Sequence, residues 1–272
     1  MKNQIVIHGG ANSPSTLNEK LQKILDNLDV NGSFLDLAVK SVVMMEDDPT
    51  FNAGTGSVPR IDGSIQMDAA VMSDSGFGSV MCIENVKHPV MVARDVMEKS
   101  PHIMLAGEGA VEFARKLEYE YYNPETEKSR EMMDKLKASI KNNTLPEKFK
   151  FMVKSSSDTV GAVARIDGKF AAAVSTGGAF PMLRGRVGDS PVIGAGIYQG
   201  EKGAVVATGI GEDIAKDLLS FRIYQQIGTD DLNEIVKKEI DKFKVSVGII
   251  AISDNEYSVY ANTDMAHAER EL

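Results

Sequence analysis

The chain has 272 residues and a formal net charge of −9, an acidic balance that argues against a nucleic-acid or membrane-surface partner. Residues 1–7 are too short a run for a signal peptide and no apolar run approaches a membrane span, so we expect a soluble, cytoplasmic protein. Cys82 is the single cysteine and lies in a strand-like apolar run, which favours a buried core thiol and a reducing compartment.

Strands and helices are predicted to alternate as far as Leu117. The β-branched run over residues 4–8 favours a first strand. Thr16 and Glu19 have the spacing of a capping box, which predicts a helix beginning there with its apolar residues on one face. The elements predicted next are a helix from Leu35 to Val43, strands over 65–72 and 79–83, a helix opened by Pro89 and a helix through Ala110 to Leu117.

From Glu118 to Asp158 the chain changes character. Charged residues crowd together, two prolines interrupt the segment, and short helical pieces are predicted only around Arg130–Lys141. A connection this long inside a compact domain usually has a function or is mobile. We therefore expect residues 118–158 to form a flexible linker that can be cut at its end.

After Thr159 the pattern predicts a strand, an Asp167-Gly168 turn and a second strand over 170–174, which together form a hairpin. A glycine-rich loop over 176–200 follows. The remaining predicted elements are a strand over 204–208, helices over 212–227 and 229–243, and strands over 245–252 and 257–260. Strands followed by helices in each half of the chain predict an α+β arrangement of layers.

Four short clusters in the second half carry the side chains of a threonine acyl-transfer site: Asp158-Thr159-Val160-Gly161, Ser175-Thr176-Gly177-Gly178, Gly185–Pro191 and Thr208–Glu212. They supply a hydroxyl nucleophile, two further hydroxyls, a cation–carboxylate pair and a glycine-rich turn. A threonine hydroxyl needs an adjacent base near neutral pH, and the α-amine of an N-terminal threonine, with a pKa of about 8, provides one.

These clusters, with Ile7–Ala11, Asp48–Ser57 and Met97–Leu105, resemble the motifs of the plant-type L-asparaginase and isoaspartyl peptidase family of N-terminal-nucleophile hydrolases. The resemblance runs over almost the whole chain. It implies an α+β fold, a four-layer αββα sandwich, formed by one domain over 1–272. It also implies self-cleavage between Asp158 and Thr159 into an α chain, 1–158, and a β chain, 159–272.

The resemblance further implies an amidohydrolase that cleaves the side-chain amide of L-asparagine, the isopeptide bond of β-aspartyl dipeptides, or both. Thr159 would be the nucleophile and the hydroxyl of Thr176 would hydrogen-bond to it. Thr208 and Gly209 would form the oxyanion hole, and Asn52 would reach the nucleophile. The residue before Thr159 is Asp158 where many relatives carry glycine, which leaves the preferred leaving group open.

Arg186 and Asp189 are predicted to bind the two charged ends of an α-amino acid. An arginine fork fits a carboxylate and an aspartate fits an ammonium group, although the default for two charges in a loop is a surface ion pair of little value. Gly209 and Gly211 are predicted to line the same substrate site, where the backbone carbonyl of Gly211 could accept from the ammonium group.

No cofactor is expected for catalysis, and the four scattered histidines show no zinc-ligand spacing. The resemblance implies a structural sodium ion and a homodimer of αβ units. The sodium would be held by six backbone carbonyls, those of Met45, Glu46, Asp48, Phe51, Ala53 and Thr55. Two alternatives stay open: a hydrolase of glycosylated asparagine, and a precursor that never matures and acts only as a binding protein.

Overall fold

The computed structural model describes residues 2–142, 156–157 and 159–272. Its largest sheet has seven strands in the order β13-β1-β6-β7-β2-β3-β4, and every neighbouring pair is antiparallel except β3 and β4. Their bounds are β1 Gln4–Ala11, β2 Met67–Ser73, β3 Gly76–Ile83, β4 Met104–Ala106, β6 Val160–Ile166, β7 Lys169–Thr176 and β13 Met265–Glu271.

A second sheet has four antiparallel strands in the order β12-β11-β10-β9. Their bounds are β9 Ile197–Gly200, β10 Gly203–Gly209, β11 Val247–Ser253 and β12 Tyr257–Ala261. A short antiparallel pair joins β5, Ser156–Ser157, to β8, Ala179–Phe180. This pair places the chain just before Thr159 next to the chain just after Gly178.

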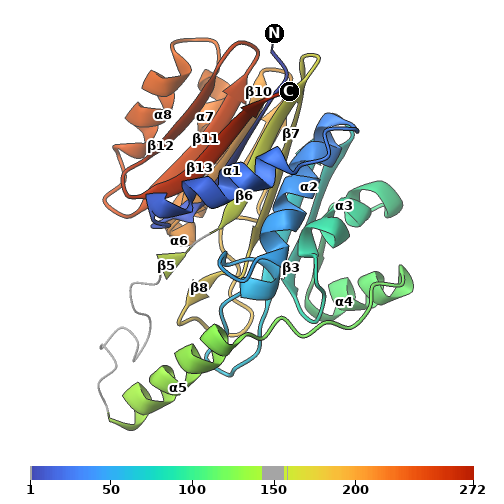
Figure 1. Ribbon diagram of the computed structural model, residues 1–272, viewed down its shortest axis with the longest axis vertical. Coiled ribbons are helices and arrows are strands. Elements are labelled where there is room, and N and C mark those ends of the chain that lie inside the picture. The colour runs from blue at the N-terminus through green and yellow to red at the C-terminus, as the bar shows by residue number, and fades with distance from the viewer. Residues whose placement is uncertain (1, 143–155, 158) are drawn as a thin grey trace.

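Helices pack on both sheets. The seven-stranded sheet shares a buried core with α1 Asn18–Asp26, α2 Phe34–Asp47, α3 Pro89–Lys99 and α4 Gly107–Lys116. The four-stranded sheet shares another with α6 Gly211–Asp217, α7 Leu219–Gln226 and α8 Leu232–Ile240. Figure 1 shows α7 and α8 on one side of the molecule and α2 to α4 on the other. The described part is therefore a mixed α/β structure with two principal sheets.

A third core cluster lies between the two sheets and explains why their strands are apolar on both faces. Successive side chains of a strand point to opposite faces. In β1, Ile5 and Ile7 accordingly join the core shared with the helices, whereas Val6 joins the cluster shared with Val206 and Ile250 of the second sheet. Both faces of β1 exclude water, which favours the near-continuous apolar runs seen in the sequence.

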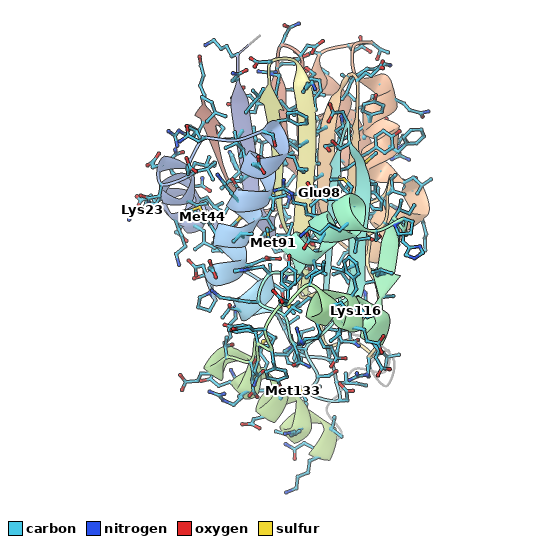
Figure 2. All side chains as sticks on the ribbon, turned by 90° about the vertical axis from the view of Figure 1, so that its right-hand side faces the viewer. Lys23, Met44, Met91, Glu98, Lys116 and Met133 are labelled. Atoms are coloured by element: carbon cyan, nitrogen blue, oxygen red, sulfur yellow. The ribbon has the colours of Figure 1, made fainter. Side chains whose placement is uncertain are left out.

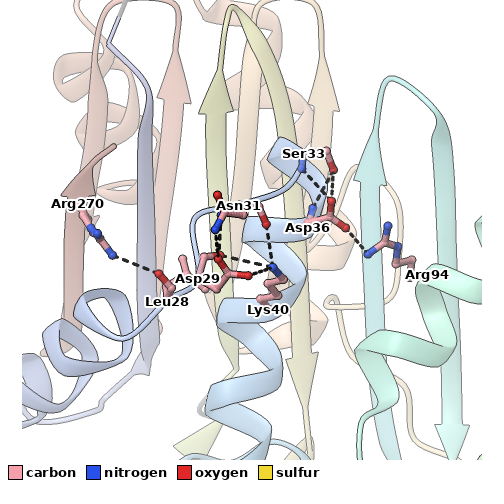
Figure 3. A network of polar contacts seen from close by, with 8 residues as sticks. All are labelled: Leu28, Asp29, Asn31, Ser33, Asp36, Lys40, Arg94 and Arg270. Atoms are coloured by element: carbon pink, nitrogen blue, oxygen red, sulfur yellow. Dashed lines mark hydrogen bonds and ion pairs between the residues drawn. The ribbon is translucent and has the colours of Figure 1, made fainter.

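A polar network at the start of α2 links this helix to α3, as Figure 3 shows. Ser33 and Asp36 form a reciprocal capping box that satisfies backbone donors at the start of the helix. Arg94 of α3 donates to the Asp36 carboxylate at 2.7 Å and so links the two helices. The capping box predicted at Thr16 and Glu19 was wrong, because residues 15–17 form a 3-10 turn and α1 begins after it without a side-chain cap.

Two elements of the second half differ from the prediction. Residues 265–271 form β13, although their sequence has no β-branched residue and gave no strand signal. Pairing with β1 overrides the weak local preference. The single helix predicted over 212–227 is divided into α6 and α7 at Leu218, whose φ of 47° lies in the left-handed region.

In the described part of the linker, α5 spans Glu127–Lys141, which confirms the predicted helical piece. Figures 1 and 2 show α5 at one end of the molecule, with Met133 on it. Its Leu136 is buried and Met132 packs on a small cluster formed by Val58, Ala179 and Met182. The end of the linker, residues 143–155 and Asp158, lies outside the described residues. Across the described chain, no helix is long and apolar enough to cross a membrane.

Candidate active site

Thr159 lies directly before β6 and is 1% exposed. Its Oγ1 is 3.1 Å from Oγ of Ser190, which is equally buried. Sequence reasoning missed Ser190. Its position directly after Asp189 could have indicated it, because a hydroxyl next to a predicted substrate-binding carboxylate belongs to the same loop of the site.

Thr176 is the last residue of β7 and Thr208 the second-last residue of β10, so the two hydroxyls come from different sheets. Val160 pairs with Ser175, so Thr176 lies one residue beyond the start of β6, at the end of β7. Its hydroxyl accepts from the Gly178 amide at 2.9 Å. No hydrogen bond joins Thr176 to Thr159 within the described residues, and the hydroxyl partner of Thr159 is Ser190 instead.

Thr208 lies near the end of β10 and connects the two sheets. Its Oγ1 accepts from the backbone amide of Ala11 in β1 at 3.0 Å, which leaves the hydroxyl proton free for another acceptor. Gly209 follows with a φ of 136°, and a Cβ there would lie 2.8 Å from Cα of Val247, so only glycine fits. A free hydroxyl proton and a glycine amide therefore lie next to each other.

Among the described residues no hydrogen bond joins Asn52 to Thr159, and its reach to the nucleophile stays a prediction. Its side-chain amide donates to the Gly178 carbonyl at 2.6 Å, and its side-chain oxygen accepts from Val58 at 3.0 Å. Its own backbone carbonyl accepts from Gly177 at 2.8 Å. Asn52 thus fastens the loop after Thr176 to the loop after α2.

Arg186, Asp189 and Gly211 lie close to one another. The guanidinium of Arg186 donates from Nε and Nη2 to both carboxylate oxygens of Glu212, at 2.9 and 2.8 Å. Sequence reasoning missed Glu212, which directly follows Gly211 and could have been suspected from its charge. A Cβ on Gly211 would lie 2.7 Å from Oδ1 of Asp189, so the absence of a side chain permits this approach.

Asp189 is 2% exposed, and its Oδ2 has no hydrogen-bond partner among the described residues. Burial raises the pKa of this carboxyl to about 7, against the attraction of Arg186. A buried carboxylate oxygen without a partner is costly. The site therefore favours a ligand that brings a cationic donor to Asp189.

His8 lies in β1 behind the nucleophile. Its Nδ1 accepts from the Gly10 amide at 3.1 Å, and burial lowers its pKa to about 3, so the ring is neutral at pH 7. The ring packs so closely on Gly161 that no Cβ could fit there.

The loop that was predicted to hold sodium is tightly curled. A Cβ on Gly54 would lie 2.5 Å from the Glu46 carbonyl, and one on Gly56 would lie 2.8 Å from the Pro49 carbonyl. The two glycine backbones therefore pack directly against carbonyl oxygens, which are hard donors of the kind that suit an alkali cation. The Glu46 side chain adds a connection to the site, because it accepts from Ser175 at 2.6 Å.

The comparison with known proteins gives one decisive match, to the family described as asparaginase, over residues 1–268. The chain belongs to the asparaginase family. This asparaginase-family chain is 36% identical to the plant-type L-asparaginase of Pyrococcus abyssi, over 91% of its own length and 89% of that protein's.

Two further curated relatives of this asparaginase-family chain carry other names. The isoaspartyl peptidase of Escherichia coli is 35% identical over 94% of this chain and 88% of its own length. The N(4)-(β-N-acetylglucosaminyl)-L-asparaginase of Elizabethkingia miricola is 37% identical over 87% of this chain and 73% of its own length. The resemblance inferred from the sequence motifs is confirmed.

Proposed function

We propose that the chain hydrolyses the side-chain amide of L-asparagine and the isopeptide bond of β-aspartyl dipeptides, with Thr159 as nucleophile. The observation that carries the proposal is the buried Thr159 hydroxyl, which lies 3.1 Å from the hydroxyl of Ser190. Ser190 belongs to the loop that also contains Arg186 and Asp189. The names of the relatives support the substrate class. The fold in this proposal is the four-layer αββα sandwich of N-terminal-nucleophile hydrolases.

Self-cleavage first creates the base. Oγ1 of Thr159 attacks the carbonyl carbon of Asp158, the C–N bond breaks as the nitrogen takes the hydroxyl proton, and an ester results. Water then hydrolyses this ester, which leaves the Asp158 carboxylate and a free α-amine on Thr159. That amine can accept the hydroxyl proton during turnover.

Substrate binding then places the β-carbonyl at Thr159. Asp189 accepts from the α-ammonium group, and guanidinium donors of Arg186 that are not used by Glu212 bind the α-carboxylate. The tetrahedral oxyanion accepts hydrogen bonds from the Thr208 hydroxyl and the Gly209 amide. Ammonia or an amine departs, and water releases L-aspartate from the ester on Thr159.

A side-by-side assay tests the substrate class. Matured protein is expected to release product from L-asparagine and β-Asp-Leu, because both present free α-ammonium and α-carboxylate groups. An α-linked Asp-Leu should not react, because its α-carboxyl is part of the peptide bond. L-Glutamine should react about 100-fold more slowly, since one methylene displaces its carbonyl. Chromatographic detection of the products measures all four reactions.

The same assay contains the contradicting outcomes. Cleavage of α-Asp-Leu without cleavage of β-Asp-Leu would overturn the assignment. The relative from Elizabethkingia miricola favours one alternative, a hydrolase of glycosylated asparagine, so a glycosyl-asparagine substrate is the fifth arm. Turnover of that substrate alone would select the alternative. A chain that stays uncut and inactive on every substrate would favour a binding protein.

A structural sodium ion in the loop after α2 is part of the proposal. The Glu46 and Phe51 carbonyls, with those of Met45, Asp48, Ala53 and Thr55, would hold it. Binding to the folded state alone would raise Tm by about 2–4 °C per kcal/mol of stabilisation. We expect a higher Tm in sodium chloride than in tetramethylammonium chloride of equal ionic strength, measured by calorimetry. Equal Tm values in the two salts would contradict the site.

A homodimer of αβ units and a cytoplasmic location stay predictions.

A further inference from the structure

Asp68 is a buried carboxylate beneath the substrate loop that the proposed chemistry does not use. It lies in β2, where its Cα partner in β7 is Thr176, and it is 0% exposed. Its Oδ1 accepts from the backbone amide of Cys82 at 2.7 Å. Its Oδ2 has no hydrogen-bond partner among the described residues. A buried carboxylate with an unpaired oxygen is costly unless a nearby positive charge or donor stabilises it.

Two arginines supply that positive charge. Arg60, itself fully buried, and Arg186 both attract the Asp68 carboxylate, and the Gly188 backbone amide also favours its ionised form. Burial raises the pKa of Asp68, while these amides and arginines act in the opposite direction. Asp68 is therefore coupled by charge to Arg186 at the start of the segment 186–189.

The same segment is packed around the guanidinium. A Cβ on Gly188 would lie 2.7 Å from Nη1 of Arg186, and one on Gly211 would lie 3.0 Å from Nη2. The Cys82 thiol contacts the Arg186 carbonyl at 3.8 Å. Because the Cys82 amide donates to Asp68, a shift of Asp68 would be transmitted through Cys82 to the Arg186 backbone.

We propose that Asp68 is a positioning residue for substrate binding, which holds the segment Arg186–Asp189 in the conformation that receives the α-carboxylate and α-ammonium groups. The inference rests on the proposed function and assigns a role to a residue outside the predicted site. Among the described residues no hydrogen bond joins Asp68 to Thr159, and the proposed chemistry gives Asp68 no contact with the substrate. Its removal should weaken binding and leave the chemical step nearly unchanged.

Asp68 also affects the charge of Asp189. The groups that act on Asp189 are Arg186, which favours its ionised form, and Glu212 and Asp68, which oppose it. Asp189 must be ionised to bind an ammonium group, so binding is present above its pKa and is lost as the pH falls through it. Without the charge of Asp68, Asp189 ionises at a lower pH, and the acid limb of binding moves downward.

The test compares wild type with Asp68→Asn, which keeps an oxygen for the Cys82 amide and removes the charge. For Asp68→Asn we expect KM for β-Asp-Leu and Kd for L-aspartate to rise about 10-fold, with kcat within about 3-fold of wild type. The acid limb of L-aspartate binding, followed by titration calorimetry between pH 5 and 9, should move to lower pH. Self-cleavage does not require an amino acid to be bound by Arg186 and Asp189, so its rate should be unchanged.

The controls separate this role from a merely structural one. Asp95→Asn removes another buried carboxylate, on α3, whose partners are Lys99 and Tyr119, and should change neither KM nor the pH limb. Asp68→Ser provides a second variant should the asparagine protein fail to fold. If Asp68→Asn left KM and the pH dependence of L-aspartate binding unchanged, the role of Asp68 alone would be overturned. A loss of self-cleavage as large as the loss of binding would also overturn it. Wild type that neither binds L-aspartate nor cleaves β-Asp-Leu would overturn the proposed function and this inference with it.

Discussion

Replacing Thr159 with alanine is expected to give a chain that stays whole and does not release ammonia from L-asparagine. The substitution removes the hydroxyl that attacks both the Asp158 carbonyl and the substrate. Loss of a covalent nucleophile lowers kcat by about 10⁴-fold or more. Intact mass after prolonged incubation measures self-cleavage, and a coupled ammonia assay measures turnover.

Two comparisons make this result specific to the hydroxyl. Thr159→Ser keeps a hydroxyl at the same position and should still cleave itself, whereas Ser190→Ala removes only the neighbouring hydroxyl at 3.1 Å and should retain the nucleophile. Cleavage of the Thr159→Ala protein at the same bond would mean that another protease cuts the chain. The proposed self-processing would then be wrong.

Thr208→Ala should lower kcat by about 10²–10³-fold, the loss typical of one oxyanion-hole donor. The expected KM for L-asparagine is close to that of wild type, because the donor acts on charge that develops only in the transition state. Steady-state kinetics of the matured variant measure both constants. A wild-type kcat would remove Thr208 from the mechanism.

The Thr208 hydroxyl also accepts from the Ala11 amide, so its loss has a separate structural cost of about 1 kcal/mol. Thermal unfolding of the same sample measures that cost. Thr208→Ser is the matched control, because it retains the hydroxyl for both partners and should retain most of the activity. A serine variant as slow as the alanine variant would point to a packing role for the threonine methyl group.

The sequence predicted the strands that are apolar on both faces and the helices with a clear apolar stripe. Such elements carry their signal locally, since burial of each face depends on the period of the pattern. β13 carried no such signal, because its pairing with β1 comes from the far end of the chain. The break at Leu218 was missed for a similar reason, since a leucine with a positive φ has no local signature.

The residue types of the candidate site were also predictable, but their partners were not. Arg186 and Asp189 stand out as charges in a glycine-rich loop, and the structure places both beside Gly211. That Glu212 binds Arg186, that Ser190 binds Thr159 and that Asn52 binds Gly178 are facts of tertiary packing. Spacing along the chain does not encode which of several nearby hydroxyls or amides meets a given atom.

The strand order of the large sheet has a consequence for a chain cut before Thr159. β1 lies between β13 and β6, and β7 pairs with β2, so strands from the two pieces would interleave. Neither piece could leave without breaking backbone ladders on both sides of β1. The cut protein would behave as a single unit until it unfolds. Once unfolded, its two halves would diffuse apart and would have to meet again, so refolding would become a second-order reaction that dilution slows.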